Sequence, residues 1–123
     1  MDKSLKKLFE NTEIIFWDFD GVIKDSVKVK SEAFEELFSS YGQNFLKRVK
    51  KHHEVNGGLS RMEKIPIYLS WTNETVSNKN IQKYCNKFSK LVKQSVIDSE
   101  WIPGFLEFIA HHHSKKNVLV TAT

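Results

Sequence analysis

The chain of 123 residues is 40% hydrophobic and 28% charged, a composition typical of one small globular domain and not of a disordered or repetitive chain. Its formal net charge of +4 comes from lysines dispersed among acidic residues, so we expect a solvated surface or the attraction of anionic ligands, and no nucleic-acid partner. No apolar run approaches the roughly 18 residues of a membrane span. Because residues 1–10 also lack the apolar segment of a secretory signal, we expect a cytoplasmic protein with no membrane partner.

The N-terminal segment predicts a short helix followed by a strand. Apolar residues at helical spacing within residues 5–9 indicate a short amphipathic helix. Residues 14–17 are four consecutive apolar residues, too few for a buried helix, and they favour a strand covered on both faces, as in a parallel sheet. Asp18 and Asp20 follow at the expected C-terminal end of this strand, the edge at which open α/β sheets bind ligands.

Asp18 and Asp20 have the spacing of side chains on one side of a strand, so both carboxylates can face the same crevice. Two such carboxylates repel each other unless a cation separates their roles, and Mg²⁺ typically takes one or two carboxylates together with phosphate oxygens. Asp18 could then attack phosphorus as a nucleophile, with Asp20 as general acid and base. The alternative is a structural turn in which Gly21 only ends the strand.

Residues 15–26 read Ile-Phe-Trp-Asp-Phe-Asp-Gly-Val-Ile-Lys-Asp-Ser. This stretch resembles the first signature motif of the haloacid dehalogenase superfamily, in its Asp-x-Asp-Gly-Val/Thr-x-x-Asp-Ser form. The resemblance implies that Asp18 is the nucleophile, that Asp20 is the general acid and base, and that both belong to a Mg²⁺ site. An aspartate at the second position, Asp20, is typical of the phosphatase and phosphomutase branches of the superfamily.

A long helical region follows the motif. Apolar residues at three- to five-residue steps predict its helices, and Ser26 or Ser31 is expected to cap the first of them. Ser60 and Glu63 match a capping box at the start of another helix, in which Pro66 predicts a kink or a late start. The helices are expected over residues 29–41, residues 43–54, a segment beginning after Ser60, and residues 81–96, with a loop over residues 71–78.

Residues 58–65 (Gly-Leu-Ser-Arg-Met-Glu-Lys-Ile) resemble the cap-domain loop of the β-phosphoglucomutase-like members of the same superfamily, in which a Gly-x-Ser-Arg stretch meets the substrate. The resemblance implies substrate contacts for Ser60 and Arg61, with the planar guanidinium of Arg61 binding a carboxylate or a second phosphate. The alternative for Arg61 is an ion pair with a nearby acid in the first helical turn. The family pattern further implies that residues 25–97 form an inserted, all-helical C1-type cap.

Three other features favour structural roles. Cys85 is the only cysteine, and its neighbours predict a packed helix face. His52 and His53 are adjacent on the expected helix, where their side chains diverge, so a solvated helix end is favoured over a metal site. The His111–His113 run lies at the end of a helix expected to begin near Pro103, and metal binding there is the weaker alternative.

Residues 117–123 predict a second buried strand that ends in a hydroxyl residue. This segment resembles the second motif of the superfamily, a hydrophobic strand closing in Ser or Thr. The resemblance implies that the Thr121 hydroxyl and the Ala122 backbone N–H donate hydrogen bonds to the transferring phosphate.

We therefore predict an α/β fold: an incomplete haloacid-dehalogenase-like Rossmannoid core with two parallel strands (residues 1–24 and 98–123) and an inserted helical cap (residues 25–97). The lysine and the acidic pair that complete the family site have no matching position, so the resemblance covers about the first half of a family domain. The function expected is a Mg²⁺-dependent phosphatase acting on a small phosphorylated metabolite through an aspartyl-phosphate, impaired in this chain. The alternatives are a phosphomutase and a non-catalytic remnant that binds a phosphorylated ligand. Open sheet edges also favour self-association.

Overall fold

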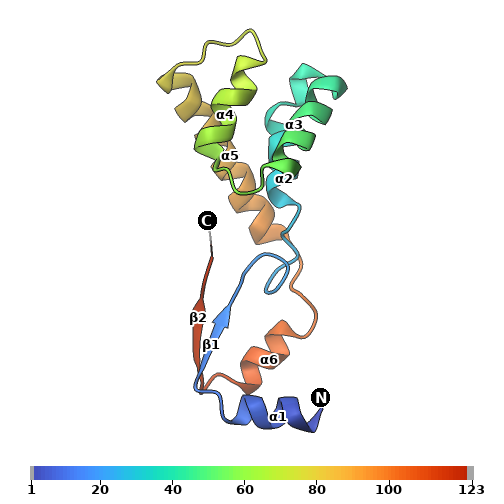
Figure 1. Ribbon diagram of the computed structural model, residues 1–123, viewed down its shortest axis with the longest axis vertical. Helices are drawn as coiled ribbons and strands as arrows, with labels where there is room; N and C mark the ends of the chain where they lie inside the picture. Colours follow the sequence, from blue (N-terminus) through green and yellow to red (C-terminus); the bar gives the residue numbers. More distant parts are fainter. Residues whose placement is uncertain (1, 122–123) are drawn as a thin grey trace. The chain divides into compact units, whose positions relative to one another are not determined.

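The computed structural model describes residues 2–121, and the chain divides into two compact units. Residues 1–27 and 99–123 form an α/β unit, and residues 28–98 form a helical unit. The elements of each unit can be followed in Figure 1. In chain order they are α1 (Lys3–Glu10), β1 (Ile14–Trp17), α2 (Val29–Leu37), the 3₁₀ helix η1 (Ser39–Tyr41), α3 (Gln43–Val55), α4 (Arg61–Ser70), α5 (Asn78–Asp98), α6 (Phe105–His111) and β2 (Lys116–Leu119).

The α/β unit is built on a two-stranded parallel sheet. Ile14 of β1 pairs with Lys116 of β2, and the register continues to the pair Trp17 and Leu119. The indole N–H of Trp17 donates to Oδ1 of Asn117 at 2.8 Å, which ties the two strands by their side chains as well. Because the strands are parallel, their C-terminal ends lie at the same edge of the sheet.

One face of this sheet is covered by aromatic packing. The Trp17 ring lies 5.1 Å from the ring of Phe105 and 5.6 Å from that of Phe108, both on α6. Phe9 of α1 extends the cluster, with its ring 5.3 Å from that of Phe108. These edge-to-face contacts between large rings hold α6 on the sheet and α1 on α6.

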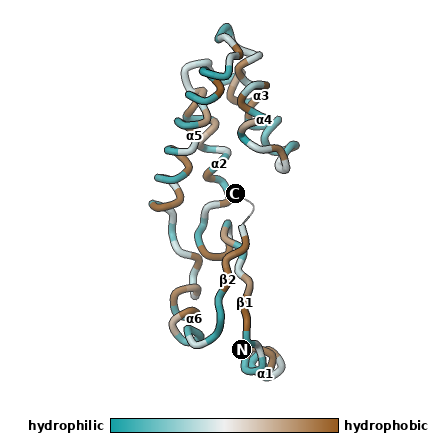
Figure 2. Tube along the Cα trace, turned by 90° about the vertical axis from the view of Figure 1, so that its left-hand side faces the viewer, coloured by the Kyte–Doolittle hydropathy of each residue, from teal (hydrophilic) through white to brown (hydrophobic). Residues whose placement is uncertain are grey.

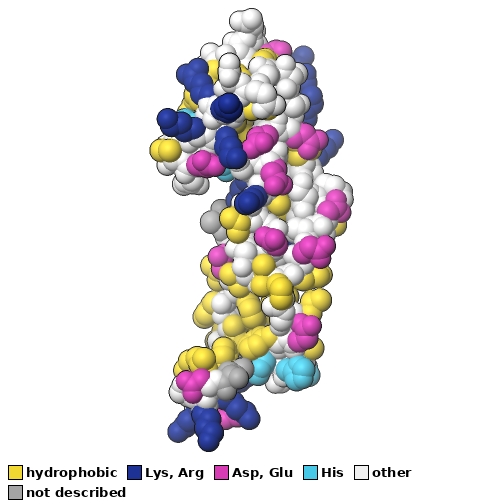
Figure 3. All heavy atoms as spheres, turned by 90° about the vertical axis from the view of Figure 1, so that its right-hand side faces the viewer, with side chains coloured by type: hydrophobic (Ala, Val, Ile, Leu, Met, Phe, Trp, Pro, Cys, Tyr) yellow, Lys and Arg dark blue, Asp and Glu magenta, His cyan; other side chains and the backbone are white. Residues whose placement is uncertain are grey.

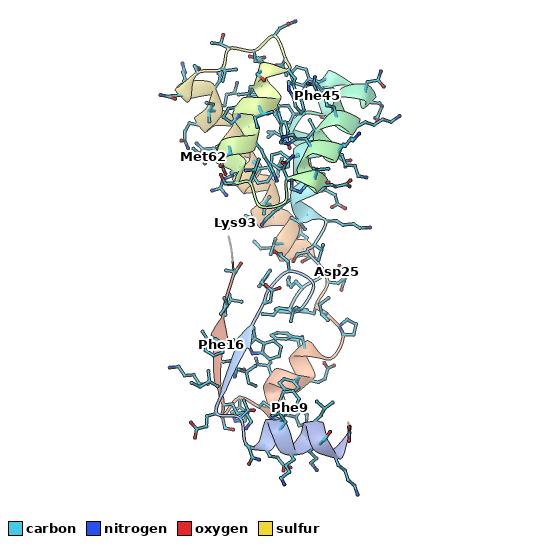
Figure 4. All side chains as sticks on the ribbon, viewed as in Figure 1. Phe9, Phe16, Asp25, Phe45, Met62 and Lys93 are labelled. Carbon is cyan, nitrogen blue, oxygen red and sulfur yellow. The ribbon has the colours of Figure 1, made fainter. Side chains whose placement is uncertain are left out.

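The opposite face of β1 is open among the described residues. Ile14 is 42% exposed and Phe16 is 68% exposed, although β1 is mostly hydrophobic (Figure 2). Phe16 is labelled on β1 in Figure 4. The prediction of a strand covered on both faces is therefore wrong for the part of the chain that the structure describes, since helices pack only on the Trp17 side.

The segments that leave and re-enter the α/β unit run side by side. The backbone N–H of Asp25 donates to the carbonyl of Glu100, and that of Ile102 donates to the carbonyl of Ile23, each at 2.9 Å. Between these bonds, Lys24 and Trp101 form an antiparallel bridge. The Lys24 ammonium also lies 4.7 Å from the centroid of the Trp101 ring, a cation–π contact.

The helical unit has a densely aromatic core. The Phe34 ring lies 4.3 Å from that of Phe88 and 5.3 Å from that of Tyr68, and the Phe38 ring stacks on Tyr84 at 5.3 Å. The buried cluster comprises Ala33, Phe34, Phe38, Val49, Ile65, Tyr68, Leu69, Cys85 and Phe88. Cys85 thus packs in the core, as predicted, and burial raises the pKa of its thiol although the charge of Arg61 opposes this.

Most of the helices predicted from periodicity are confirmed. The helix expected over residues 43–54 is α3, that expected over residues 81–96 is the longer α5, and the loop between α4 and α5 lies where it was expected. The helix expected over residues 29–41 ends its α-helical part at Leu37 and continues as η1, and Gly42 stops it with a φ of 87°. None of the described helices is long and apolar enough to cross a membrane.

Two local predictions are corrected by the structure. Lys28, and neither Ser26 nor Ser31, is the N-cap residue of α2, because the Ser26 hydroxyl donates to Oδ1 of Asp20 instead. Pro66 does not delay α4, which begins at Arg61 and runs through the proline.

Candidate functional site

Asp18 lies immediately after β1, at the C-terminal edge of the sheet. Its side chain is exposed. The backbone N–H of Val120 donates to the carbonyl of Trp17 at 2.7 Å, so the ladder continues one residue past the end of β2. This bond places Asp18 beside the segment that leads into Thr121, at the edge where parallel sheets bind ligands.

Asp20 is held by the tight turn that follows. The Ser26 hydroxyl, itself only 3% exposed, donates to Oδ1 of Asp20 at 2.7 Å. The backbone N–H of Gly21 closes the turn on the carbonyl of Lys24 at 2.8 Å. Gly21 has a φ of 76°, and a Cβ there would lie 2.8 Å from Cγ2 of Val27. Both the backbone conformation and the available space therefore require glycine.

The two carboxylates keep oxygen atoms available for a ligand. Oδ1 of Asp18 accepts the backbone N–H of Phe19 at 2.8 Å, and Oδ1 of Asp20 accepts the Ser26 hydroxyl. The second oxygen of each carboxylate receives no hydrogen bond from the part of the chain that the structure describes. Hard carboxylate oxygens of this kind fit Mg²⁺, which usually keeps several water or phosphate ligands besides one or two carboxylates.

Asp18 and Asp20 have no third potential metal ligand beside them among the described His, Cys, Asp and Glu side chains. Among residues 2–121, no group of three or more His, Cys, Asp or Glu side chains is arranged to hold a metal ion. The donor set that the described residues offer is therefore the pair Asp18 and Asp20. A cation held by two carboxylates retains coordination positions for substrate oxygens.

The residues predicted to bind phosphate follow β2. Thr121 is exposed and lies two positions beyond Leu119, the last residue of the strand. The strand predicted over residues 117–123 is thus shorter, covering Lys116–Leu119. Ala122 lies outside the described residues, so its predicted role stays a prediction.

Ser60 and Arg61 belong to the helical unit, at the start of α4. The backbone N–H of Ser60 donates to Oε2 of Glu63 at 2.9 Å, and the two residues form the predicted capping box. These hydrogen bonds lower the pKa of Glu63. Arg61 is exposed and forms no ion pair with a described acid, so the alternative of an ion pair in the first turn is not found among the described residues. The substrate contacts of both residues remain predictions.

The structure reveals a buried basic pair that the sequence analysis missed. Lys64 is 2% exposed, and its Nζ lies 3.0 Å from Nδ1 of His53. Burial is the main reason that the pKa of each group lies below its ordinary value. The positive charge of Lys64 lowers the pKa of His53 further, and that of Lys30 lowers both pKa values. The sequence does not indicate that Lys64 is buried, because a lysine next to Glu63 is typical of an exposed, charged helical turn.

His52 and His53 are half-buried and hydrogen-bonded, so the prediction of a solvated helix end is wrong. Nδ1 of His52 lies 3.1 Å from the Tyr68 hydroxyl, and burial raises the pKa of Tyr68 to about 12. In the other histidine run, Nδ1 of His111 lies 2.7 Å from the carbonyl of Glu107. In each run, the Nδ1 atoms of two histidines therefore lie within hydrogen-bond distance of the protein's own groups.

The comparisons with known proteins identify a fold and no close relative. No protein-family model matches the chain, and no curated protein matches it. It is similar to a crystal structure of CbbY from Rhodobacter sphaeroides, an aspartate-to-asparagine mutant in complex with xylulose-(1,5)bisphosphate, with a TM-score of 0.62 and 16% identity. The match covers 91% of this chain and 52% of that chain, so the chain spans about half the length of CbbY. The expected α/β fold, with two parallel strands and a helical unit between them in the sequence, is therefore confirmed.

Proposed function

We propose that the chain carries the phosphoryl-transfer site of a Mg²⁺-dependent phosphatase that acts on a small phosphorylated metabolite. One observation carries the proposal: two carboxylates, Asp18 and Asp20, follow a parallel strand at its C-terminal edge, and the second of them is fixed by the buried Ser26 hydroxyl. The fold likeness to CbbY, whose solved complex contains a bisphosphate, supports this assignment.

The roles follow from the surroundings of each carboxylate. Asp18 is exposed and keeps one oxygen without a hydrogen bond from the described residues, as a nucleophile requires. Asp20 is half-buried and oriented by Ser26, as a residue that gives and takes a proton at one position requires. Mg²⁺ bound by the pair would neutralise negative charge between the carboxylates and the incoming phosphate.

In the first step, an oxygen of Asp18 attacks phosphorus, the bond from phosphorus to the leaving oxygen breaks, and Asp20 protonates that oxygen. An aspartyl-phosphate on Asp18 results. In the second step, Asp20 removes a proton from water, the water oxygen attacks phosphorus, and the Asp18 carboxylate and inorganic phosphate are released. The exposure of Asp18 favours water as the acceptor, and therefore a phosphatase over a phosphomutase.

Thr121 is assigned to the phosphate in this proposal. Its position after β2, next to the ladder bond between Val120 and Trp17, supports a hydroxyl that donates to a phosphate oxygen beside Asp18. Donors positioned in advance around a transferring phosphate lower the barrier because charge is spread over its oxygens in the transition state.

The test measures phosphate release from a generic aryl phosphate with and without Mg²⁺. Asp18→Asn is expected to abolish release, and Asp20→Asn to lower it by at least about a hundredfold, the usual contribution of a general acid. Glu107→Gln removes an exposed carboxylate of α6 in the same unit and is expected to leave release unchanged. Release that persists in Asp18→Asn, or that does not depend on Mg²⁺, contradicts the proposal.

A second candidate is the binding of a phosphorylated ligand without turnover. The observation that favours it is the donor set, since the described residues offer two carboxylates and no third acidic, histidine or cysteine ligand. Binding of inorganic phosphate or of an unreactive phosphonate in the presence of Mg²⁺, lost in Asp18→Ala and without any phosphate release, would support this candidate over the enzyme.

A further inference from the structure

The helical unit contains a hollow that the proposed chemistry does not use. It has a volume of about 400 Å³ and is lined by Tyr41, Phe45, Trp71, Thr72, Asn73 and Glu74. This volume lies within the range of small-molecule sites, which are typically lined by aromatic side chains and a few polar groups. All six residues belong to the helical unit, in which Figure 4 labels Phe45.

Three aromatic rings from different segments form the apolar walls. Tyr41 comes from η1, Phe45 from α3, and Trp71 caps the C-terminus of α4. The Tyr41 and Phe45 rings are 5.0 Å apart, and the Phe45 and Trp71 rings are 6.3 Å apart at 74° to each other. The three rings that line the hollow are therefore not coplanar, and aromatic walls set at different angles suit an organic cation, which is attracted to π faces.

Glu74 supplies negative charge at the same hollow. Its side chain is exposed and forms no ion pair within the described part of the chain. The loop that carries it is ordered by local bonds: the Thr72 hydroxyl donates to the carbonyl of Leu69 at 2.7 Å, and the backbone N–H of Glu74 donates to that hydroxyl at 3.0 Å. No lysine or arginine is among the residues that line the hollow, so Glu74 is the charged residue of its lining.

A cation already uses one of these rings. The Arg48 guanidinium carbon lies 3.8 Å from the centroid of the Trp71 ring, although Arg48 does not line the hollow. The Trp71 ring is therefore placed where the chain itself makes a cation–π contact, and tryptophan is the best of the aromatic residues for this interaction.

We propose that the hollow bounded by Tyr41, Phe45, Trp71 and Glu74 binds a small organic ammonium ion. The rings contact the alkyl groups around the nitrogen, and the Glu74 carboxylate balances the charge. This site is independent of the acidic pair in the α/β unit and of the phosphatase proposed for it.

The test titrates the intact chain with choline and, in parallel, with 3,3-dimethylbutan-1-ol, its neutral isostere, and follows the indole N–H signal of Trp71 by NMR. Choline is expected to bind at least about fivefold more tightly than the alcohol, because only the ammonium ion gains from the π faces and from Glu74. Equal affinities, or no shift of the Trp71 signal with choline, would overturn the proposal.

Two matched variants test whether the Glu74 carboxylate contributes to choline binding. Glu74→Gln is expected to weaken choline binding about threefold to tenfold and to leave the binding of the alcohol unchanged. Glu36→Gln, at an exposed position of α2 in the same unit, is expected to change neither. Both positions are exposed, so the variants are expected to fold. An equal loss in the two variants would mean that only the general charge of the protein matters, and the proposal would fail.

Discussion

The helical unit and the α/β unit differ most in how much they bury. The largest fully buried side chains all belong to the helical unit: Tyr68, Phe34, Phe38, Lys64, Ile65, Leu69 and Val49. In the α/β unit the buried side chains are those of Ile23 and Ser26 among the described residues, and its helices α1 and α6 bury none completely. In Figure 3, hydrophobic side chains gather on the surface of the α/β unit, while charged ones spread over the helical unit.

The unit with the larger buried core is therefore not the unit that carries the acidic pair. Burial of apolar surface is the main source of folding free energy, so the helical unit contributes most of it. The acidic pair lies in the unit with the smaller core, where local opening is expected to require less free energy.

The largest expected effect contrasts two phenylalanines. Phe38→Ala removes a fully buried ring from the helical core and is expected to lower the free energy of unfolding by about 3–5 kcal/mol. Phe16→Ala removes a ring that is 68% exposed and is expected to cost less than about 0.5 kcal/mol. Denaturant unfolding followed by circular dichroism measures both. Similar losses at the two positions would mean that the sheet face with Phe16 is covered in solution.

A glycine pair tests the turn beside the acidic residues. Gly21→Ala forces a side chain into the left-handed backbone region against Val27 and is expected to cost about 1–3 kcal/mol. Gly58→Ala, at a position with open space and no positive φ, is expected to be neutral or slightly stabilising. Thermal unfolding of the two variants checks this. A neutral Gly21→Ala would show that the turn is not held in the described conformation.

The capping box of α4 has a smaller effect. Ser60→Ala removes the N-cap side chain and is expected to cost about 1 kcal/mol, whereas Ser40→Ala, at an exposed position of η1, is expected to cost almost nothing. Chemical denaturation of the helical unit measures the difference. If Ser60→Ala also weakens substrate or phosphate binding beyond its effect on stability, the predicted substrate contact gains support.

The smallest effect is a pH dependence centred on Lys64 and His53. The folded-state pKa of His53 is lowered, mainly by burial and then by Lys64, so the unfolded chain binds the proton more readily. The free energy of unfolding should therefore fall as the pH drops from neutrality through the ordinary histidine range near 6.5. Unfolding at several pH values measures this slope, and His53→Gln should reduce it. An unchanged slope would mean that other groups dominate.

Periodicity predicted the helices well because each has one buried stripe. α3 and α5 were found from apolar steps alone, and Ser60 with Glu63 identified the start of α4. The division of the first long helix into α2 and η1 was not visible, because Tyr41 continues the apolar spacing up to Gly42. Spacing reports which face is buried, and it does not report which hydrogen-bond pattern closes the last turn.

At the candidate site, spacing predicted where the carboxylates lie but not how they are held. The apolar run of β1 placed Asp18 at the strand end, and the structure has it there. The sequence predicts Ser26 as a candidate helix cap, but its hydroxyl donates to Asp20, six residues earlier. That contact depends on the tight turn at Gly21, and a contact across a turn leaves no periodic signal in a sequence. The contact between Lys64 and His53 leaves no periodic signal either, because it joins two different helices.

The pairing of β1 with β2 has a consequence for synthesis. Trp17 bonds to Asn117, 100 positions later, whereas contacts among the intervening helices, such as Phe34 with Phe88 and Phe38 with Tyr84, span about half that separation. Chains form local contacts quickly and distant ones slowly, and on the ribosome the N-terminal strand emerges long before its partner is made. The helices between them can therefore complete their core first. The edge that carries Asp18 takes shape after that core, once the second strand has been made.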